Sequence, residues 1–329
     1  MKNENYYIGC DIGSTSVKTV ALDEKREIKS FSYVRNSGII ESVKTSLHSL
    51  ELPSNAEIKG FGITGSGRQF GSSLLEADIT KTEILAHAKA AAYYYPEVRT
   101  IFEIGGEDCK LIVLDKGKIR DFQMNTICGG GTGAMIESIA ARIGIPVGDI
   151  GQIALKSKSD VSIAGKCGIF AQSTVVSKIN MGVSKEDILM GICRALVSNY
   201  FAMLAKGKTL QPPFVFQGAP AFNHALIHCF EKEIGSSVNV PPHPHLMGAI
   251  GMALYLFEEN IKKTKFIGFE NIKCDLHTRN ITSNKCANRC EITYLFREKE
   301  FVASFGNRCE TCGNPPVPEK AKEAHEQFA

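Results

Sequence analysis

One sequence pattern occurs twice in this chain, and the duplication limits the possible folds more than any other feature. Residues 6–23 and 102–115 each contain a short apolar segment, a turn of small residues and a second apolar segment. A shift of 92 positions aligns Asp11 with Glu103, Gly13 with Gly105, and Lys18 with Lys110. An internal repeat of this kind predicts an α/β protein with two similar lobes. Two such units facing each other across a cleft could hold a nucleoside triphosphate from both sides.

Both turns contain the residue types expected at a site for phosphate and magnesium. Asp11 and Glu103 lie near the ends of apolar segments, where a carboxylate could hold Mg²⁺. The residues predicted to contact the nucleotide in the two turns are Gly13, Ser14, Thr15, Ser16, Lys18, Gly105 and Gly106. For one turn alone, a hairpin that happens to be rich in small residues is the alternative. Chance explains two matching turns far less easily.

Residues 125–144 read NTICGGGTGAMIESIAARIG, a cysteine and a glycine run followed by an amphipathic pattern. The spacing of the apolar residues predicts a helix that begins near Thr132. The N–H groups at a helix start favour a phosphate or the thiolates of a metal cluster. The nucleotide contacts predicted here are Gly129, Gly130, Gly131, Thr132 and Gly133. From this segment alone, a buried structural role for Cys128 is an equal alternative.

Two later segments carry related signals. Cys167 lies beside a glycine and before a helical pattern, as Cys128 does. Residues 214–230 read as a strand that breaks at Gly218 and Ala219 into a helix. Backbone at such a break can lie flat against an adenine ring, so both residues are predicted to contact adenosine.

Glu83 and His87 lie four residues apart in an alanine-rich segment, residues 80–95, that predicts a helix. At this spacing the two side chains share one helical face. The pair could face the cleft or a partner surface. A solvated or capped pair is the favoured interpretation.

The composition excludes several functional classes. The 329 residues include eleven cysteines, 22% charged residues and a net charge of +3, with no basic cluster that would indicate nucleic acid. No signal peptide is evident and no apolar run approaches the roughly 18 residues of a membrane span, so we expect a cytoplasmic protein without a membrane partner. Because the cytosol keeps thiols reduced, the cysteines indicate metal or redox chemistry rather than disulfides.

The C-terminal part changes character and carries five cysteines at metal-binding spacing. They are Cys274, Cys286, Cys290, Cys309 and Cys312. The segments EITYLF and FVASF between the third and fourth cysteines predict a hairpin. Two short cysteine hooks joined by a hairpin resemble a zinc ribbon, and thiolates also hold iron–sulfur clusters, so Zn²⁺ and a second cluster are both open. Disulfides are the alternative. Residues 315–329 are predicted to form a flexible tail.

Six segments in this order carry a family resemblance: DIGSTSVK, EIGGEDCK, CGGGTG, GKCGIFAQS, FQGAPAFN and PHPHLMGAIGMA. From about Tyr6 to Phe257, the chain resembles the ATP-dependent activators of 2-hydroxyacyl-CoA dehydratases and benzoyl-CoA-type reductases. The resemblance implies the duplicated, ribonuclease H-like fold of actin, heat-shock chaperone ATPases and sugar kinases. It also implies a homodimer that shares one 4Fe-4S cluster, with Cys128 and Cys167 as the ligands from each subunit.

The resemblance implies an ATPase that passes one low-potential electron to a separate iron–sulfur enzyme, after receiving it from a donor such as ferredoxin or flavodoxin. Asp11, Glu103 and Glu107 are the predicted catalytic residues. Glu103 and Glu107 replace the Asp and Gln that are common in the family, which puts the rate of ATP hydrolysis in doubt more than ATP binding. The alternatives are a small-molecule kinase of the same fold and a nucleotide-gated metal protein that regulates a partner without electron transfer.

We expect four parts along the chain. Residues 1–95 form the first ATPase lobe, which a helix near 245–258 closes. Residues 96–244 form the second lobe with the cluster cysteines. Residues 270–314 form the cysteine-rich module, and residues 315–329 follow as the tail.

Overall fold

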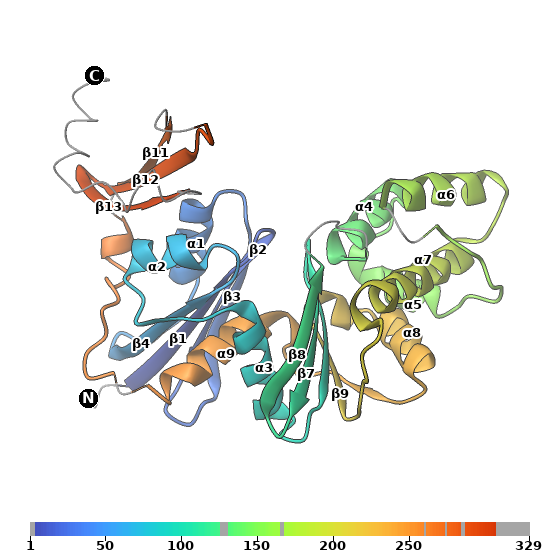
Figure 1. Ribbon diagram of the computed structural model, residues 1–329, viewed down its shortest axis with the longest axis horizontal. Helices are drawn as coiled ribbons and strands as arrows, with labels where there is room; N and C mark the ends of the chain where they lie inside the picture. Colours follow the sequence, from blue (N-terminus) through green and yellow to red (C-terminus); the bar gives the residue numbers. More distant parts are fainter. Residues whose placement is uncertain are drawn as a thin grey trace.

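The computed structural model describes residues 4–125, 131–164, 168–259, 261–273, 275–283 and 287–306. Within them, two five-stranded sheets and one three-stranded sheet form the frame, and helices lie between and beside them (Figure 1). The α/β class expected from the sequence is therefore confirmed.

The first sheet has the strand order β3-β2-β1-β4-β5. Its strands are β1 (Glu4–Ile12), β2 (Ser16–Leu22), β3 (Ile28–Arg35), β4 (Ala56–Thr64) and β5 (Ile79–Thr80). The first three strands are antiparallel neighbours, and β4 joins β1 in parallel. Helices α1 (Ile39–His48) and α2 (Arg68–Leu75) belong to the same lobe.

The second sheet repeats this topology, with the order β8-β7-β6-β9-β10. Its strands are β6 (Thr100–Ile104), β7 (Cys109–Asp115), β8 (Lys118–Asn125), β9 (Phe214–Gln217) and β10 (Val238–Asn239). Again three antiparallel strands come first, and a parallel strand joins the first of them. The predicted duplication is thus confirmed by the sheets, strand for strand.

Helices α3 (Glu83–Tyr94) and α9 (Met247–Leu256) pack against each other between the two sheets. One hydrophobic cluster joins these helices to strands of both lobes, for example Val20, Ile112 and Ile250. The helices approach closely because Gly251 has no side chain: a Cβ there would lie 1.9 Å from the carbonyl oxygen of Ala86. Gly251 therefore allows α9 to pack closely against α3.

The remaining helices extend the second lobe away from the first (Figure 1). They are α4 (Gly133–Ile143), α5 (Ile150–Ala154), α6 (Gly168–Asn180), α7 (Lys185–Tyr200) and α8 (His224–Ile234). Short helical turns are η1 (Val147–Asp149), η2 (Phe201–Ala205), η3 (Ala219–Phe222), η4 (Pro244–Leu246) and η5 (Asn271–Lys273). Helix α4 begins after Thr132, where the sequence predicted it.

The longest apolar helix lies largely inside the fold. The continuous helix Lys185–Ala205 has 21 residues and a mean hydropathy of 1.6, which meet the length and composition of a membrane span. Its most apolar stretch is 61% buried inside the fold, as in a core helix. Tyr200, for example, is fully buried and donates a hydrogen bond to the carbonyl oxygen of Lys110.

The third sheet follows the two lobes along the chain and packs on the first of them. Its antiparallel strands are β11 (Leu276–Thr282), β12 (Glu291–Arg297) and β13 (Glu300–Phe305). The β12–β13 hairpin matches the prediction, whereas β11 was not predicted. The rings of Phe61 and Phe266 stack with centroids 4.3 Å apart, and Arg297 lies 3.1 Å from Glu76. The third sheet and the segment that precedes it are therefore joined to the first lobe by apolar and ionic contacts.

Several predicted features fall outside the described residues. They are Cys128, Gly129, Gly130, Cys167, Cys274, Cys286, Cys309, Cys312 and the tail 315–329. Cys290 is described and buried. The predicted domain boundaries stay a prediction.

Candidate functional site

A cleft of about 490 Å³ lies between the two lobes, a size typical of small-molecule sites. Thirteen predicted site residues line it: Asp11, Gly13, Ser14, Thr15, Ser16, Lys18, Glu103, Gly105, Gly106, Glu107, Gly133, Gly218 and Ala219. Residues from far apart in the sequence thus meet at one site.

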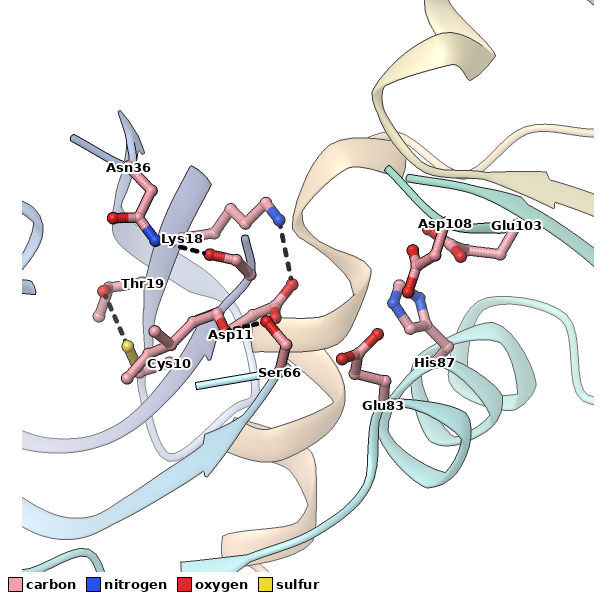
Figure 2. A network of polar contacts seen from close by, with 12 residues as sticks. Cys10, Asp11, Lys18, Thr19, Asn36, Ser66, Glu83, His87, Glu103 and Asp108 are labelled. Atoms are coloured by element: carbon pink, nitrogen blue, oxygen red, sulfur yellow. Dashed lines mark hydrogen bonds and ion pairs between the residues drawn. The ribbon is translucent and has the colours of Figure 1, made fainter. Parts of the chain in front are cut away.

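The two repeated turns supply matching acid–lysine pairs to this cleft. Asp11 and Lys18 are register partners across the β1–β2 hairpin, and their charged groups lie 3.3 Å apart. Glu103 and Lys110 occupy the same register positions across β6–β7, and their charged groups lie 3.1 Å apart. Figure 2 shows Asp11 and Lys18 on one side of the cleft and Glu103 on the other. The sequence repeat therefore produces two opposed charge pairs.

The Glu103–Lys110 pair includes two further carboxylates that the Asp11–Lys18 pair lacks. The Lys110 ammonium also lies 2.8 Å from Glu83 and 2.8 Å from Asp108. Its side chain is 2% exposed. Neither Glu83 nor Asp108 was predicted as a site residue. The favoured interpretation of Glu83 and His87 as a solvated pair is wrong, because His87 is buried and both residues line the cleft (Figure 2).

Burial and the ion pairs shift the pKa values of this cluster. Burial raises the pKa of Glu103 to about 7, although the charge of Lys110 acts in the opposite direction. Burial also lowers the pKa of Lys110, but the carboxylates of Glu103, Glu83 and Asp108 outweigh it and hold that pKa well above its usual value. Lys110 therefore remains a fixed positive charge beside the cleft.

His87 lies behind these groups as a neutral ring. Burial, helped by the charge of Lys110, lowers its pKa from 6.5 to about 4. The ring nitrogen Nδ1 lies 3.1 Å from the amide nitrogen of Gln217 on β9. The side chain thus links α3 to the second sheet.

We expect His87 to make stability depend on pH. Because its pKa is 6.5 when the chain is unfolded and about 4 in the fold, the unfolded chain binds more protons between these values. The contribution is complete above pH 6.5 and is lost as the pH falls toward 4. Between pH 7 and pH 4.5, wild type should lose roughly 2 kcal/mol more unfolding free energy than His87→Gln in urea titrations. Parallel curves for the two proteins would contradict this assignment.

The start of α4 is tied directly to the second turn. The Gly133 N–H donates to the carbonyl oxygen of Gly105 at 2.9 Å, and the Ala134 N–H donates to that of Gly106 at 2.8 Å. The Gly133 N–H is thus engaged within the protein, while Gly133 itself lines the cleft and its contact with a nucleotide stays a prediction. Thr132 and Gly131, which precede the helix, are described, and Thr132 is fully buried. A displacement of the second turn must therefore displace the start of α4.

The backbone break at Gly218 lies beside Glu103, since a Cβ at Gly218 would be 3.3 Å from Glu103 Oε1. Gly218 has φ of +95°, and a Cβ there would lie 2.0 Å from the carbonyl oxygen of Ile104, so only glycine fits. Val147, Pro220 and Phe222 line the cleft nearby. An apolar wall beside a tight backbone break suits a nucleotide base, as the sequence predicted for Gly218 and Ala219.

The fold brings together the two helices that follow the predicted cluster cysteines. Helix α6 begins directly after Cys167, and α4 begins shortly after Cys128. The two helices are in contact, and the Gln172 side-chain amide donates a hydrogen bond to Ser138 Oγ. Cys128 and Cys167 themselves lie outside the described residues, and their role as iron–sulfur ligands stays a prediction.

Other groups in the described part of the chain are less suitable for a metal. Among those residues, no cluster of three or more His, Cys, Asp or Glu side chains is arranged to hold a metal ion. Burial raises the pKa of both Cys10 and Cys109 to about 12, which keeps them as thiols. Mg²⁺ would need ligands from nucleotide phosphates besides one or two carboxylates, which is its usual mode.

Residues 8–255 match the model of the BadF/BadG/BcrA/BcrD ATPase family. The 2-hydroxyisocaproyl-CoA dehydratase activator of Clostridioides difficile is 34% identical over 77% of this chain and 96% of its own length. The (R)-2-hydroxyglutaryl-CoA dehydratase activating ATPase of Acidaminococcus fermentans is 32% identical over 78% of this chain and 99% of its own. The solved structure of the Clostridium difficile activator with bound ADPNP has a TM-score of 0.71 at 32% identity, and covers 77% of this chain and 94% of that one.

Proposed function

Because the chain belongs to the BadF/BadG/BcrA/BcrD ATPase family, we propose that it hydrolyses ATP and delivers one low-potential electron to a separate iron–sulfur dehydratase or reductase. The observation that carries the proposal is the pair of backbone hydrogen bonds from Gly133 and Ala134 to the second turn. They join the phosphate side of the cleft to the helix that follows Cys128. A change at the phosphates can therefore reach the start of α4 through these two hydrogen bonds.

The two turns hold the triphosphate in this proposal. Small residues from Gly13 to Ser16 and at Gly105 and Gly106 let backbone N–H groups approach phosphate oxygens. Lys18 and Lys110 offset the phosphate charge. Asp11 and Glu103 hold Mg²⁺ directly or through water, with the phosphates supplying its other oxygen ligands.

ATP hydrolysis then controls electron transfer through the arrangement of the lobes. ATP can shift a conformational equilibrium only by the difference in its affinity for the two conformers. A difference of roughly 2 kcal/mol changes their populations about thirtyfold. The coupling between Gly105 and α4 would turn such a shift into a different position for the Cys128 segment.

Cys128 and Cys167 hold the cluster, and a second subunit completes its ligands. When bound, the 4Fe-4S group supplies one-electron redox chemistry at low potential. Two cysteines from one chain ligate only two of the four irons. A second subunit, related by a two-fold axis through the cluster, would provide the other two cysteine ligands. The donor is ferredoxin or flavodoxin in the cytoplasm, where the thiols stay reduced.

The C-terminal module is proposed to hold a second metal. Its donors are Cys274, Cys286, Cys290, Cys309 and Cys312, with Zn²⁺ or an iron–sulfur cluster as the metal. A stable hairpin, β12–β13, separates the third cysteine from the last two. This arrangement supports two short ligand hooks at one end of the sheet.

The proposal is tested on anaerobically purified full-length protein. We expect phosphate release from ATP, a reduced-state EPR signal that changes with ATP, and a dimeric mass. A protein lacking any iron or any ATPase activity would contradict the proposal. A monomer with a full cluster would reject the shared ligation alone.

A further inference from the structure

Both repeated turns are connected to helix α4, but through different contacts. The second turn holds the start of α4 through the backbone hydrogen bonds of Gly133 and Ala134. The first turn reaches the same helix through the end of β3, where the Arg35 guanidinium lies 3.2 Å from the carboxylate of Glu137 on α4. Arg35 and Glu137 both line the cleft. This ion pair therefore joins the first lobe to a helix of the second lobe across the cleft.

Arg35 is fixed to the first turn because the end of β3 is bonded to that turn. The Asn36 N–H donates to the carbonyl oxygen of Thr15 at 2.9 Å, and the Asn36 side-chain amide donates to that of Gly13 at 2.9 Å (Figure 2). Arg35 is also the register partner of Ser16. The first turn and the end of β3 therefore form one unit, as the second turn and the start of α4 do.

The two turns also contact each other directly. Thr15 packs against Gly106, where a Cβ would overlap the Thr15 side chain. The spacing between the turns therefore controls the spacing between Arg35 and Glu137. The ion pair forms when the turns lie close together, as they do here, and a larger separation would break it.

Strand β3 makes a second contact toward the other side of the cleft. The Tyr33 ring centroid lies 5.7 Å from that of His245, which in turn lies 5.1 Å from that of Phe222 on η3. Tyr33 and Arg35 are two residues apart, so they lie on the same face of the strand. Both contacts therefore depend on the position of this face relative to the second lobe.

We propose that the Arg35–Glu137 pair is a latch that favours the conformer in which the two turns lie close, an inference that rests on the proposed nucleotide binding. Phosphates held by Lys18 on one side and Lys110 on the other draw the turns together. The nucleotide and the latch then favour the same conformer, so the latch strengthens ATP binding and carries lobe closure to α4. Its two side chains are 81% and 48% exposed, so the pair is weak enough to break in each cycle.

The test measures the ATP affinity of the full-length protein with Arg35→Gln and with Glu137→Gln. We expect each variant to bind ATP about two- to fivefold more weakly, the range for loss of an exposed ion pair. The sign for Glu137→Gln is decisive, because removal of a carboxylate near phosphates would otherwise strengthen ATP binding. The reversed pair, Arg35→Glu with Glu137→Arg, should restore most of the affinity. The differences from wild type should shrink at about 1 M salt, which screens exposed charges.

The ion pair of Arg99 and Asp115 provides the matched control, since it is also exposed but lies within the second lobe and does not line the cleft. Arg99→Gln and Asp115→Asn should match wild type. Stronger ATP binding by Glu137→Gln would overturn the latch and indicate that Arg35 acts on the phosphates directly. Unchanged affinity in both cleft variants, or no rescue by the reversed pair, would also overturn it. A wild-type protein that does not bind ATP would instead reject the proposed nucleotide function.

Discussion

Cys128→Ser is expected to lose the shared iron and acid-labile sulfide and to abolish electron delivery, while the protein still folds and hydrolyses ATP. Serine is a poor iron ligand compared with a thiolate, and a two-fold dimer would lose two of four ligands at once. The measurement is iron and sulfide per chain, together with reduced-state EPR with and without ATP. The metal of the C-terminal module should remain, so the two metal contents need separate quantification.

Cys229→Ala is the matched control. Cys229 is buried on α8, where its thiol contacts Met190, and burial raises its pKa to about 11. This variant should keep the cluster signal. If Cys128→Ser keeps all iron and its EPR response, then Cys128 is structural, and the kinase or regulatory alternatives become the better hypotheses.

Lys110→Met is expected to cost about 3–5 kcal/mol of unfolding free energy and to prevent ATP binding. Lys110 is 1% exposed and lies near three carboxylates, so its removal leaves several negative charges without a partner in a poorly solvated region. Urea unfolding at pH 8 gives the stability, and a fluorescent nucleotide gives the affinity. The loss of stability should shrink toward pH 5, because protonation of Glu103, whose pKa is already raised to about 7, relieves part of the repulsion.

The repeat provides the control for this experiment. Lys18 occupies the equivalent position but has one carboxylate partner, and its side chain is 16% exposed. Lys18→Met should therefore cost clearly less stability than Lys110→Met. Adding Glu103→Gln to Lys110→Met should restore part of the loss. Equal costs for the two lysine variants would contradict the electrostatic explanation.

The sequence was sufficient for features that depend on local pattern. The repeat at Asp11 and Glu103 predicted two equivalent hairpins, and both formed with the same register. The apolar spacing after Thr132 predicted α4, because a helix buries one face at a fixed period. Gly218 was recognisable because a strand breaks there. Each of these signals lies within a short stretch of chain.

Features that depend on tertiary contact were missed. Nothing near Glu83 indicates that it reaches Lys110, since the contact depends on how α3 packs between two distant sheets. Glu107 was predicted as catalytic from the family resemblance, and it is exposed and lines the cleft. Asp108 also lines the cleft and contacts Lys110, and nothing in the local sequence indicates that contact. Strand β11 was missed because its sequence, LHTRNIT, shows no regular alternation of apolar and polar residues.

The C-terminal sheet has a mechanical consequence. It is attached to the first lobe through Leu276 and Leu295, which join that lobe's hydrophobic cluster, and through the Arg297–Glu76 ion pair, whereas α6 lies at the far end of the second lobe (Figure 1). In the proposed ATP-driven shift, a body attached to one lobe would move as a lever arm, so a small rotation at the nucleotide would become a larger displacement at its tip. Fluorophores on β11 and α6 would therefore convert each turnover cycle into a change of distance.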